Sequence, residues 1–161
     1  MRTLGTVLIA LVLVVAWGSG AVAGDKPWFD LEKCSFCKSL TAQPGLLEHN
    51  AWEQYPISNG IVSVTTVDPE YVEAFEVAHA EMEKTGQRMM KGEQVYTCGS
   101  CTAMGAILMK GIHHENVMTS RGSVWIATSD SPEVVAELQG WAKRNGEEMA
   151  KMKSQPMKSK M

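Results

Sequence analysis

Four cysteines, arranged as two Cys-x-x-Cys pairs, are the residues of this chain best suited to chemistry. The first pair is Cys34 and Cys37, and the second is Cys98 and Cys101. A thiolate is both a metal ligand and a nucleophile, and its pKa falls at the N-terminus of a helix. Two sulfurs three residues apart can hold one Cu(I) ion, supply half of a tetrahedral Zn(II) site or close a small reactive disulfide. The spacing favours these three chemistries over inert cysteines or static disulfides.

The segments that follow the two cysteine pairs are alike. Twelve residues after the second cysteine of each pair stands a histidine, His49 in one copy and His113 in the other. Apolar segments at 60–66 and 122–128 then begin with glycine, and each is followed by an aspartate and a Pro-Glu dipeptide. We interpret this repetition as an internal duplication.

Each half of the duplication, 24–92 and 93–152, is predicted to contain a helix, a β-hairpin and a second helix, which gives an α+β fold. Alternation of apolar and polar residues indicates the strands, and a proline just after an aspartate or serine indicates the start of each second helix. A strand at 93–97 is expected to precede the second cysteine pair. The other expected elements are helices at 31–41 and after Cys98 as far as Gly111, hairpins at 52–67 and 115–129, and helices that begin at 69 and 132.

The element order of the second half, in which a strand leads into Cys-x-x-Cys and a helix, resembles that of the ferredoxin-like heavy-metal-associated domains of copper chaperones. Those domains carry a methionine two residues before the first cysteine, where this chain has Glu32 and Tyr96. Their closing strand has no counterpart here. The resemblance is one of element order, and it implies a ferredoxin-like arrangement of strands and helices.

Histidines are the next candidate ligands, because imidazole is a common ligand for zinc and copper. His49 and His113 stand at matching positions, and we consider both as supplementary metal ligands. The alternative is that they lie at strand or helix ends and face water. His79 falls on the apolar stripe of its predicted helix, so it is expected to be a core or interface residue.

Methionines are frequent, at 11 of 161 residues. Met104 follows Cys101 by three residues and could complete a Cys2Met site for Cu(I), since thioether sulfur is a soft ligand. The alternative is that each methionine fills space in an irregular core.

The first 23 residues have the features of a signal peptide. Arg2 precedes an apolar run at 6–17, which is short for a membrane span, and Ala21-Val22-Ala23 is a small-x-small cleavage site. An uncleaved anchor is the alternative. We expect a periplasmic or secreted protein with no stable membrane span after signal removal, and a disordered tail at 153–161.

The formal net charge of −3 argues against a nucleic-acid partner, which would favour a basic surface. Exported proteins often carry framework disulfides, but those usually join distant segments, whereas tight Cys-x-x-Cys pairs are typical of redox or metal sites. If the halves pack about a pseudo-twofold axis, the pairs could meet in one four-sulfur site. If the cysteine pairs lie far from that axis, the chain has two separate two-thiolate sites.

We therefore predict a non-catalytic exported protein that binds a Cu(I) or Zn(II) ion, with a protein partner as a further candidate. One alternative is a thiol-disulfide oxidoreductase, in which Cys98 attacks and Cys101 resolves the mixed disulfide. Another is a structural zinc or disulfide staple within a partner-binding domain. The candidate metal ligands are Cys34, Cys37, Cys98, Cys101, His49, His113 and Met104.

Overall fold

The computed structural model describes residues 26–154 and shows an α+β fold with one four-stranded antiparallel sheet. The predicted signal peptide lies outside the described residues, as does the tail beyond Ser154. Lys153 and Ser154 belong to the last helix, so the predicted disorder does not begin at 153. The elements are α1 (Lys38–Thr41), β1 (Asn50–Ile57), β2 (Gly60–Val67), the short 3-10 helix η1 (Pro69–Tyr71), α2 (Val72–Met90), α3 (Gly99–Leu108), β3 (His113–Thr119), β4 (Gly122–Thr128) and α4 (Pro132–Ser154).

The two hairpins meet in the middle of the sheet, whose strand order is β1-β2-β4-β3. Glycines permit this central pairing at both ends. A Cβ on Gly60 would lie 1.9 Å from the carbonyl oxygen of Ala127, and a Cβ on Gly122 would lie 2.1 Å from that of Thr65. Gly122 also has a φ of 128°, which L-residues with a side chain rarely adopt. The glycines that open the two matching apolar segments therefore let β2 and β4 approach each other.

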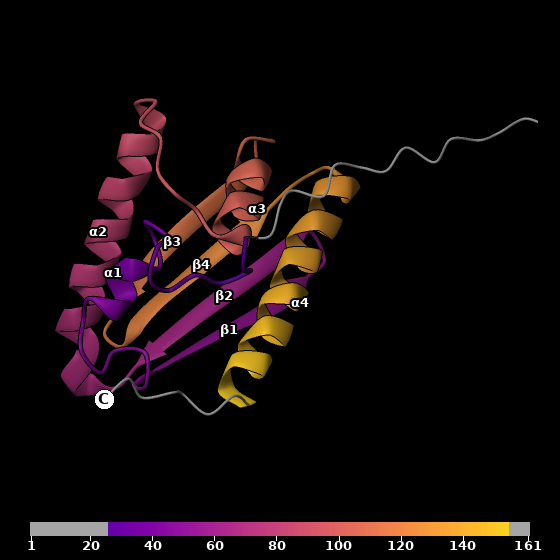
Figure 1. The fold of residues 1–161 in the computed structure, drawn as a ribbon. Coiled ribbons are helices and arrows are strands. Elements are labelled where there is room, and N and C mark those ends of the chain that lie inside the picture. Colours follow the sequence, from indigo (N-terminus) through magenta and orange to yellow (C-terminus); the bar gives the residue numbers. More distant parts are fainter. Residues whose placement is uncertain (1–25, 155–161) are drawn as a thin grey trace, which may run out of the picture.

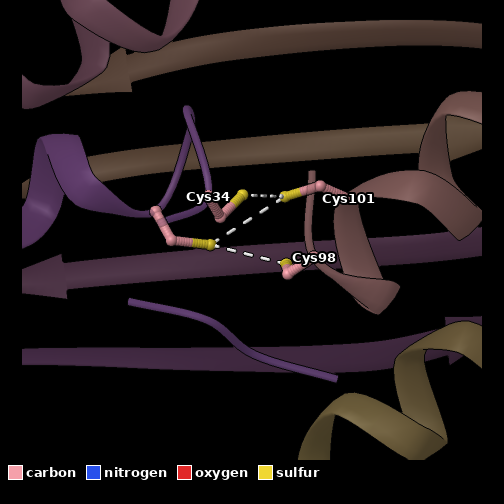
Figure 2. A group of neighbouring side chains, drawn as sticks. Cys34, Cys98 and Cys101 are labelled. Atoms are coloured by element: carbon pink, nitrogen blue, oxygen red, sulfur yellow. Dashed lines mark hydrogen bonds between the residues drawn. The ribbon is translucent and has the colours of Figure 1, made fainter. Parts of the chain in front are cut away.

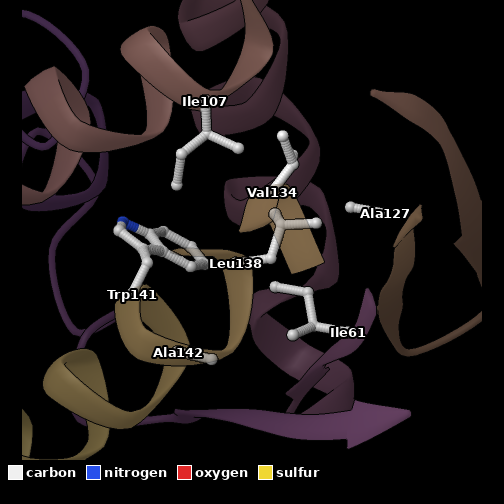
Figure 3. Packing of buried hydrophobic residues seen from close by; sticks show 7 residues of the cluster. All are labelled: Ile61, Ile107, Ala127, Val134, Leu138, Trp141 and Ala142. Carbon is white, nitrogen blue, oxygen red and sulfur yellow. The ribbon is translucent and has the colours of Figure 1, made fainter. Parts of the chain in front are cut away.

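Helices α2, α3 and α4 lie on the same face of the sheet (Figure 1). Helix α4 packs on β1 and β2 and against α3, while α2 contacts β4 and α1. The main core lies between α3, α4 and the central strands (Figure 3), and a smaller one lies beneath α2 and the segment before β1. The main cluster consists of Ile61, Ile107, Ala127, Val134, Leu138, Trp141 and Ala142.

The expected strand at 93–97 is wrong, because these residues form a loop. The backbone of this loop pairs with the first cysteine segment instead of a sheet edge: the carbonyl oxygen of Tyr96 accepts a hydrogen bond from the Ser35 N–H at 2.8 Å. The sheet of the described residues therefore has no leading strand there and does not show the ferredoxin-like order.

The first predicted helix, at 31–41, is also too long, since only α1 at its end is helical. Asp30 caps a turn, with its Oδ1 accepting from the Lys33 N–H at 2.8 Å. The helical hydrogen-bond pattern then breaks, because the Ser35 N–H donates to the carbonyl oxygen of Tyr96 and not to the carbonyl oxygen four residues earlier, as it would in a helix. This turn is what carries the first cysteine pair.

Among residues 26–154, no helix is both long and apolar enough to cross a membrane.

Candidate metal centre

The four cysteine sulfurs converge on one place. Three contacts join the two pairs: Sγ of Cys37 lies 3.7 Å from that of Cys98 and 3.9 Å from that of Cys101, and Sγ of Cys34 lies 3.7 Å from that of Cys101. All four sulfurs lie within 4.8 Å of one another. Figure 2 shows Cys34, Cys98 and Cys101 pointing toward a common centre. The sequence left open whether the pairs make one site or two, and the structure shows one cluster.

The second pair is positioned by the start of helix α3. Cys98 is the N-cap residue with an extended backbone, and Cys101 follows in the first helical turn. Residues three apart on a helix face the same side, so both sulfurs point toward the first pair. In the first pair the second cysteine, Cys37, is the N-cap residue of helix α1, and its backbone is helical rather than extended.

A backbone contact with residues 27–28 fixes the N-terminus of α3. The N–H groups of Gly99 and Ser100 donate to the carbonyl oxygens of Pro27 and Trp28, at 3.0 and 2.9 Å. These partners satisfy donors that a helix start leaves free. A Cβ on Gly99 would lie 3.1 Å from the Trp28 ring, so the absence of a side chain allows this close approach.

Asn145 is a positioning residue that the sequence analysis missed. It is 1% exposed, and its Oδ1 accepts hydrogen bonds from Trp28 Nε1 at 2.8 Å and Ser100 Oγ at 2.9 Å. Its Nδ2 donates to Gln54 Oε1 at 3.1 Å. One side chain of α4 therefore ties the segment before the first cysteine pair to the helix of the second pair. The sequence held one indication of this role: Asn145 is a polar residue one helical turn after Trp141, on the buried side of a predicted helix.

Burial and mutual contact shift the thiol pKa values in opposite directions. The hydrogen bond with Cys101 lowers the pKa of Cys98 to about 6 and lowers that of Cys34 far below its usual range. The contacts with Cys34, Cys37 and Cys98, together with burial, raise the pKa of Cys101 well above its usual range. Cys34 and Cys98 are fully buried. Because buried anionic sulfurs need a nearby positive charge, the cluster is suited to a cation.

The other predicted ligands, His49, His113 and Met104, are not part of the cysteine cluster. The group of converging donor atoms among the described residues contains the four cysteines and neither predicted histidine. His49 Nδ1 lies 2.8 Å from Asp68 Oδ2, and its ring stacks on Tyr71 with centroids 4.2 Å apart. His113 begins the exposed edge strand β3. Met104 packs against the main core. Their roles as ligands stay predictions.

The arrangement can do two things chemically. Four sulfurs around one centre can bind a metal ion whose identity the cluster alone does not fix. Sulfurs in contact between the pairs can also form disulfides. Comparison with protein-family models, with curated proteins and with solved structures gave no match for this chain.

Proposed function

We propose that this protein binds one Zn(II) ion per chain through its four cysteines, and that the ion is structural. The observation that carries the proposal is the spacing of the sulfurs. Zinc–sulfur bonds of about 2.3 Å in a tetrahedron place neighbouring sulfurs about 3.8 Å apart. The three sulfur contacts between the pairs measure 3.7, 3.7 and 3.9 Å.

Cu(I), the other candidate metal, suits the spacing between the pairs less well when it is bound by one sulfur from each pair. Two bonds of about 2.3 Å in a straight line would separate the sulfurs by about 4.6 Å, if copper–sulfur bonds are taken as long as zinc–sulfur bonds. That separation exceeds the 3.7 Å between Cys34 and Cys101 or between Cys37 and Cys98. Tetrahedral four-sulfur sites are instead typical of zinc or iron.

A structural role follows from which ligands the site has and what they connect. Four protein sulfurs complete a tetrahedron and leave no position for a substrate, as in structural zinc sites. The cysteines come from a segment, 27–49, whose one helix is the four-residue α1, and from the start of α3. The ion would hold this irregular segment against the second half of the chain.

We propose further that the two halves arose by duplication and pack about a pseudo-twofold axis. Ser63 and Trp125 each stand three residues after the glycine that opens their strand, and they are partners in the β2–β4 pairing. Equivalent residues that face each other mark such an axis. The proposal also includes export, through the signal peptide at 1–23, to the periplasm or the outside of the cell.

A thiol-disulfide oxidoreductase is the second candidate, favoured by one observation. Cys98 is the N-cap of α3, and its pKa is lowered to about 6, mainly by the hydrogen bond with Cys101. A lowered pKa favours the nucleophilic thiolate at neutral pH, and because Cys98 is fully buried, this role requires the cysteine cluster to open toward the substrate. In that role Cys98 would attack a substrate disulfide and Cys101 would resolve the mixed disulfide.

Elemental analysis of the purified full chain, with a thiol count after denaturation and chelation, tests the proposal. We expect one zinc per chain and four titratable thiols, and a loss of bound zinc in Cys37→Ser. Ser39→Ala, a matched change at another buried position of the same segment, should keep the zinc. Two zinc ions per chain would contradict a single zinc site. Absence of both zinc and free thiols would refute the metal reading and favour the oxidoreductase.

A further inference from the structure

A second group of metal-ligating side chains surrounds a pocket of about 380 Å³ on the helix-covered face of the sheet. None of the four cysteines lines this pocket. Its walls include His79 of α2, Met104 of α3 and His114 of β3, together with Trp125 of β4. Three chain segments that are far apart in sequence thus bring two imidazoles and one thioether to the same cavity.

His79 is held in an orientation that suits a ligand. The Asn116 side-chain amide donates to His79 Nε2 across 3.1 Å, so this nitrogen carries the lone pair. The other ring nitrogen, Nδ1, then carries the proton and lies 3.5 Å from Glu83 Oε1, one helical turn away. A carboxylate next to one ring nitrogen fixes the tautomer and the orientation of the ring, as around metal-binding histidines.

Strand β3 presents further soft or borderline donors on the same face. His114, Asn116 and Met118 alternate along β3, so they point to the same side of the sheet. The His114 ring is tilted against Trp125, with centroids 6.2 Å apart. Met118 Sδ lies 3.8 Å from Asn116 Nδ2, the same atom that contacts His79. A second thioether therefore lies at the edge of the pocket.

The donor set determines the kind of ion. Thioether sulfur is a ligand that selects Cu(I), and imidazole also suits copper. The residues that line the pocket include Glu83 but no lysine or arginine, so no fixed positive charge opposes a cation. The indole ring of Trp125 adds a surface that attracts cations. These features favour a soft monovalent ion over a hard divalent one.

We propose that this pocket binds one Cu(I) ion through His79, His114 and Met104, with Met118 as a further thioether at its edge. Binding replaces the hydrogen bond from Asn116 to His79 Nε2 with a bond from that nitrogen to the metal. No residue is oxidised or reduced. The site is separate from the cysteine cluster, and it does not depend on which ion that cluster holds.

Methionine-methyl NMR of the zinc-loaded full chain, titrated with Ag(I) as a redox-silent probe of Cu(I) and then anaerobically with Cu(I), distinguishes the two sites. We expect the methyl signals of Met104 and Met118 to shift, while those of the exposed Met90 and Met109 stay in place. The near-isosteric Met104→Leu should weaken this binding at least tenfold, on the scale of changes in metal-site residues. Met109→Leu is the matched control.

Replacement of a single histidine gives a second test that spares the core. His114 lies on the exposed edge strand β3, and His114→Gln should weaken Ag(I) or Cu(I) binding in the pocket at least tenfold. His113 lies one residue earlier and on the opposite face of the sheet, so His113→Gln should leave this binding unchanged. If all methionine methyls stay in place while the added metal displaces zinc from the cysteines, the proposal is overturned. Equal effects of the two histidine changes would also overturn it.

Discussion

Replacing Asn145 by alanine should destabilise the protein more than any surface change in α4. The variant removes three hydrogen bonds of the native structure and leaves the Trp28 indole N–H and the Ser100 hydroxyl without their acceptor. Each lost bond is worth about 1 kcal/mol, and an orphaned buried donor costs about 1–3 kcal/mol. Because some orphaned groups can rotate or reach water, we expect the free energy of unfolding to fall by about 3–5 kcal/mol.

Urea unfolding of the protein with added zinc, the ion proposed for the cysteine cluster, measures this loss when it is followed by tryptophan fluorescence. Lys143→Ala is the control, since the Lys143 side chain is 78% exposed and its ion pair with Glu147 spans 3.9 Å. It should change stability by less than about 0.5 kcal/mol. In the same samples, competition with a chromophoric chelator should show weaker zinc binding by Asn145→Ala, about tenfold, as for other residues that support ligands.

Two results would refute this reasoning. A stability loss below about 1 kcal/mol would mean that the three hydrogen bonds of Asn145 contribute little net free energy. A full stability loss with unchanged zinc affinity would mean that Asn145 supports the core without positioning the cysteine segments.

Three further outcomes follow from the structure. Removal of the metal by a chelator should raise hydrogen exchange in the segment 27–49 while β2 and β4 stay protected, because the main core does not include the cysteines; uniform exchange across the chain would contradict this. Leu138→Ala, at a fully buried core position, should lower the free energy of unfolding by about 2–5 kcal/mol, and a loss below 1 kcal/mol in thermal or urea unfolding would show that the site collapses readily. The hydroxyl of Ser131 donates to Glu133 and holds the pKa of that carboxyl below its usual range, so the carboxylate contributes stability at pH values above its ordinary pKa, and this stability is lost as the pH falls through the lowered pKa. Ser131→Ala should raise the pKa of Glu133 in an NMR titration, and an unchanged pKa would exclude the hydroxyl as the cause.

The features that were predicted correctly from sequence are those with a local cause. The hairpins follow from alternation and from glycine near the turn, and β2 begins at Gly60, one residue before the expected start at Ile61. The start of the last helix at Pro132 is also confirmed. The Cys-x-x-Cys spacing predicted two pairs of chemistry-bearing sulfurs, because the two cysteines of each pair need only the local geometry of one turn to lie close together.

The features that failed depend on partners far away in the chain. Residues 93–97 have a strand-like composition, but the carbonyl oxygen of Tyr96 accepts a hydrogen bond from the Ser35 N–H, and these residues do not pair with the described sheet. The first helix is shortened by the same contact. Asn145 could not be recognised as a positioning residue, because its partners Trp28 and Ser100 are 117 and 45 residues away. Sequence periodicity does not report such pairings.

The order of the strands explains why the cysteines meet at all. In a simple meander, β1-β2-β3-β4, the second hairpin would be displaced from the first by two strands, about 9–10 Å. Equivalent loops would then be at least that far apart, beyond the 3.7 Å that separates Cys37 from Cys98. Under the proposed duplication, pairing β2 with β4 instead relates the hairpins by a rotation whose axis would pass near Ser63 and Trp125, which are partners in that pairing. Equivalent segments can meet on such an axis. The β2–β4 pairing that Gly60 and Gly122 permit therefore also allows two Cys-x-x-Cys pairs to form a single four-sulfur site.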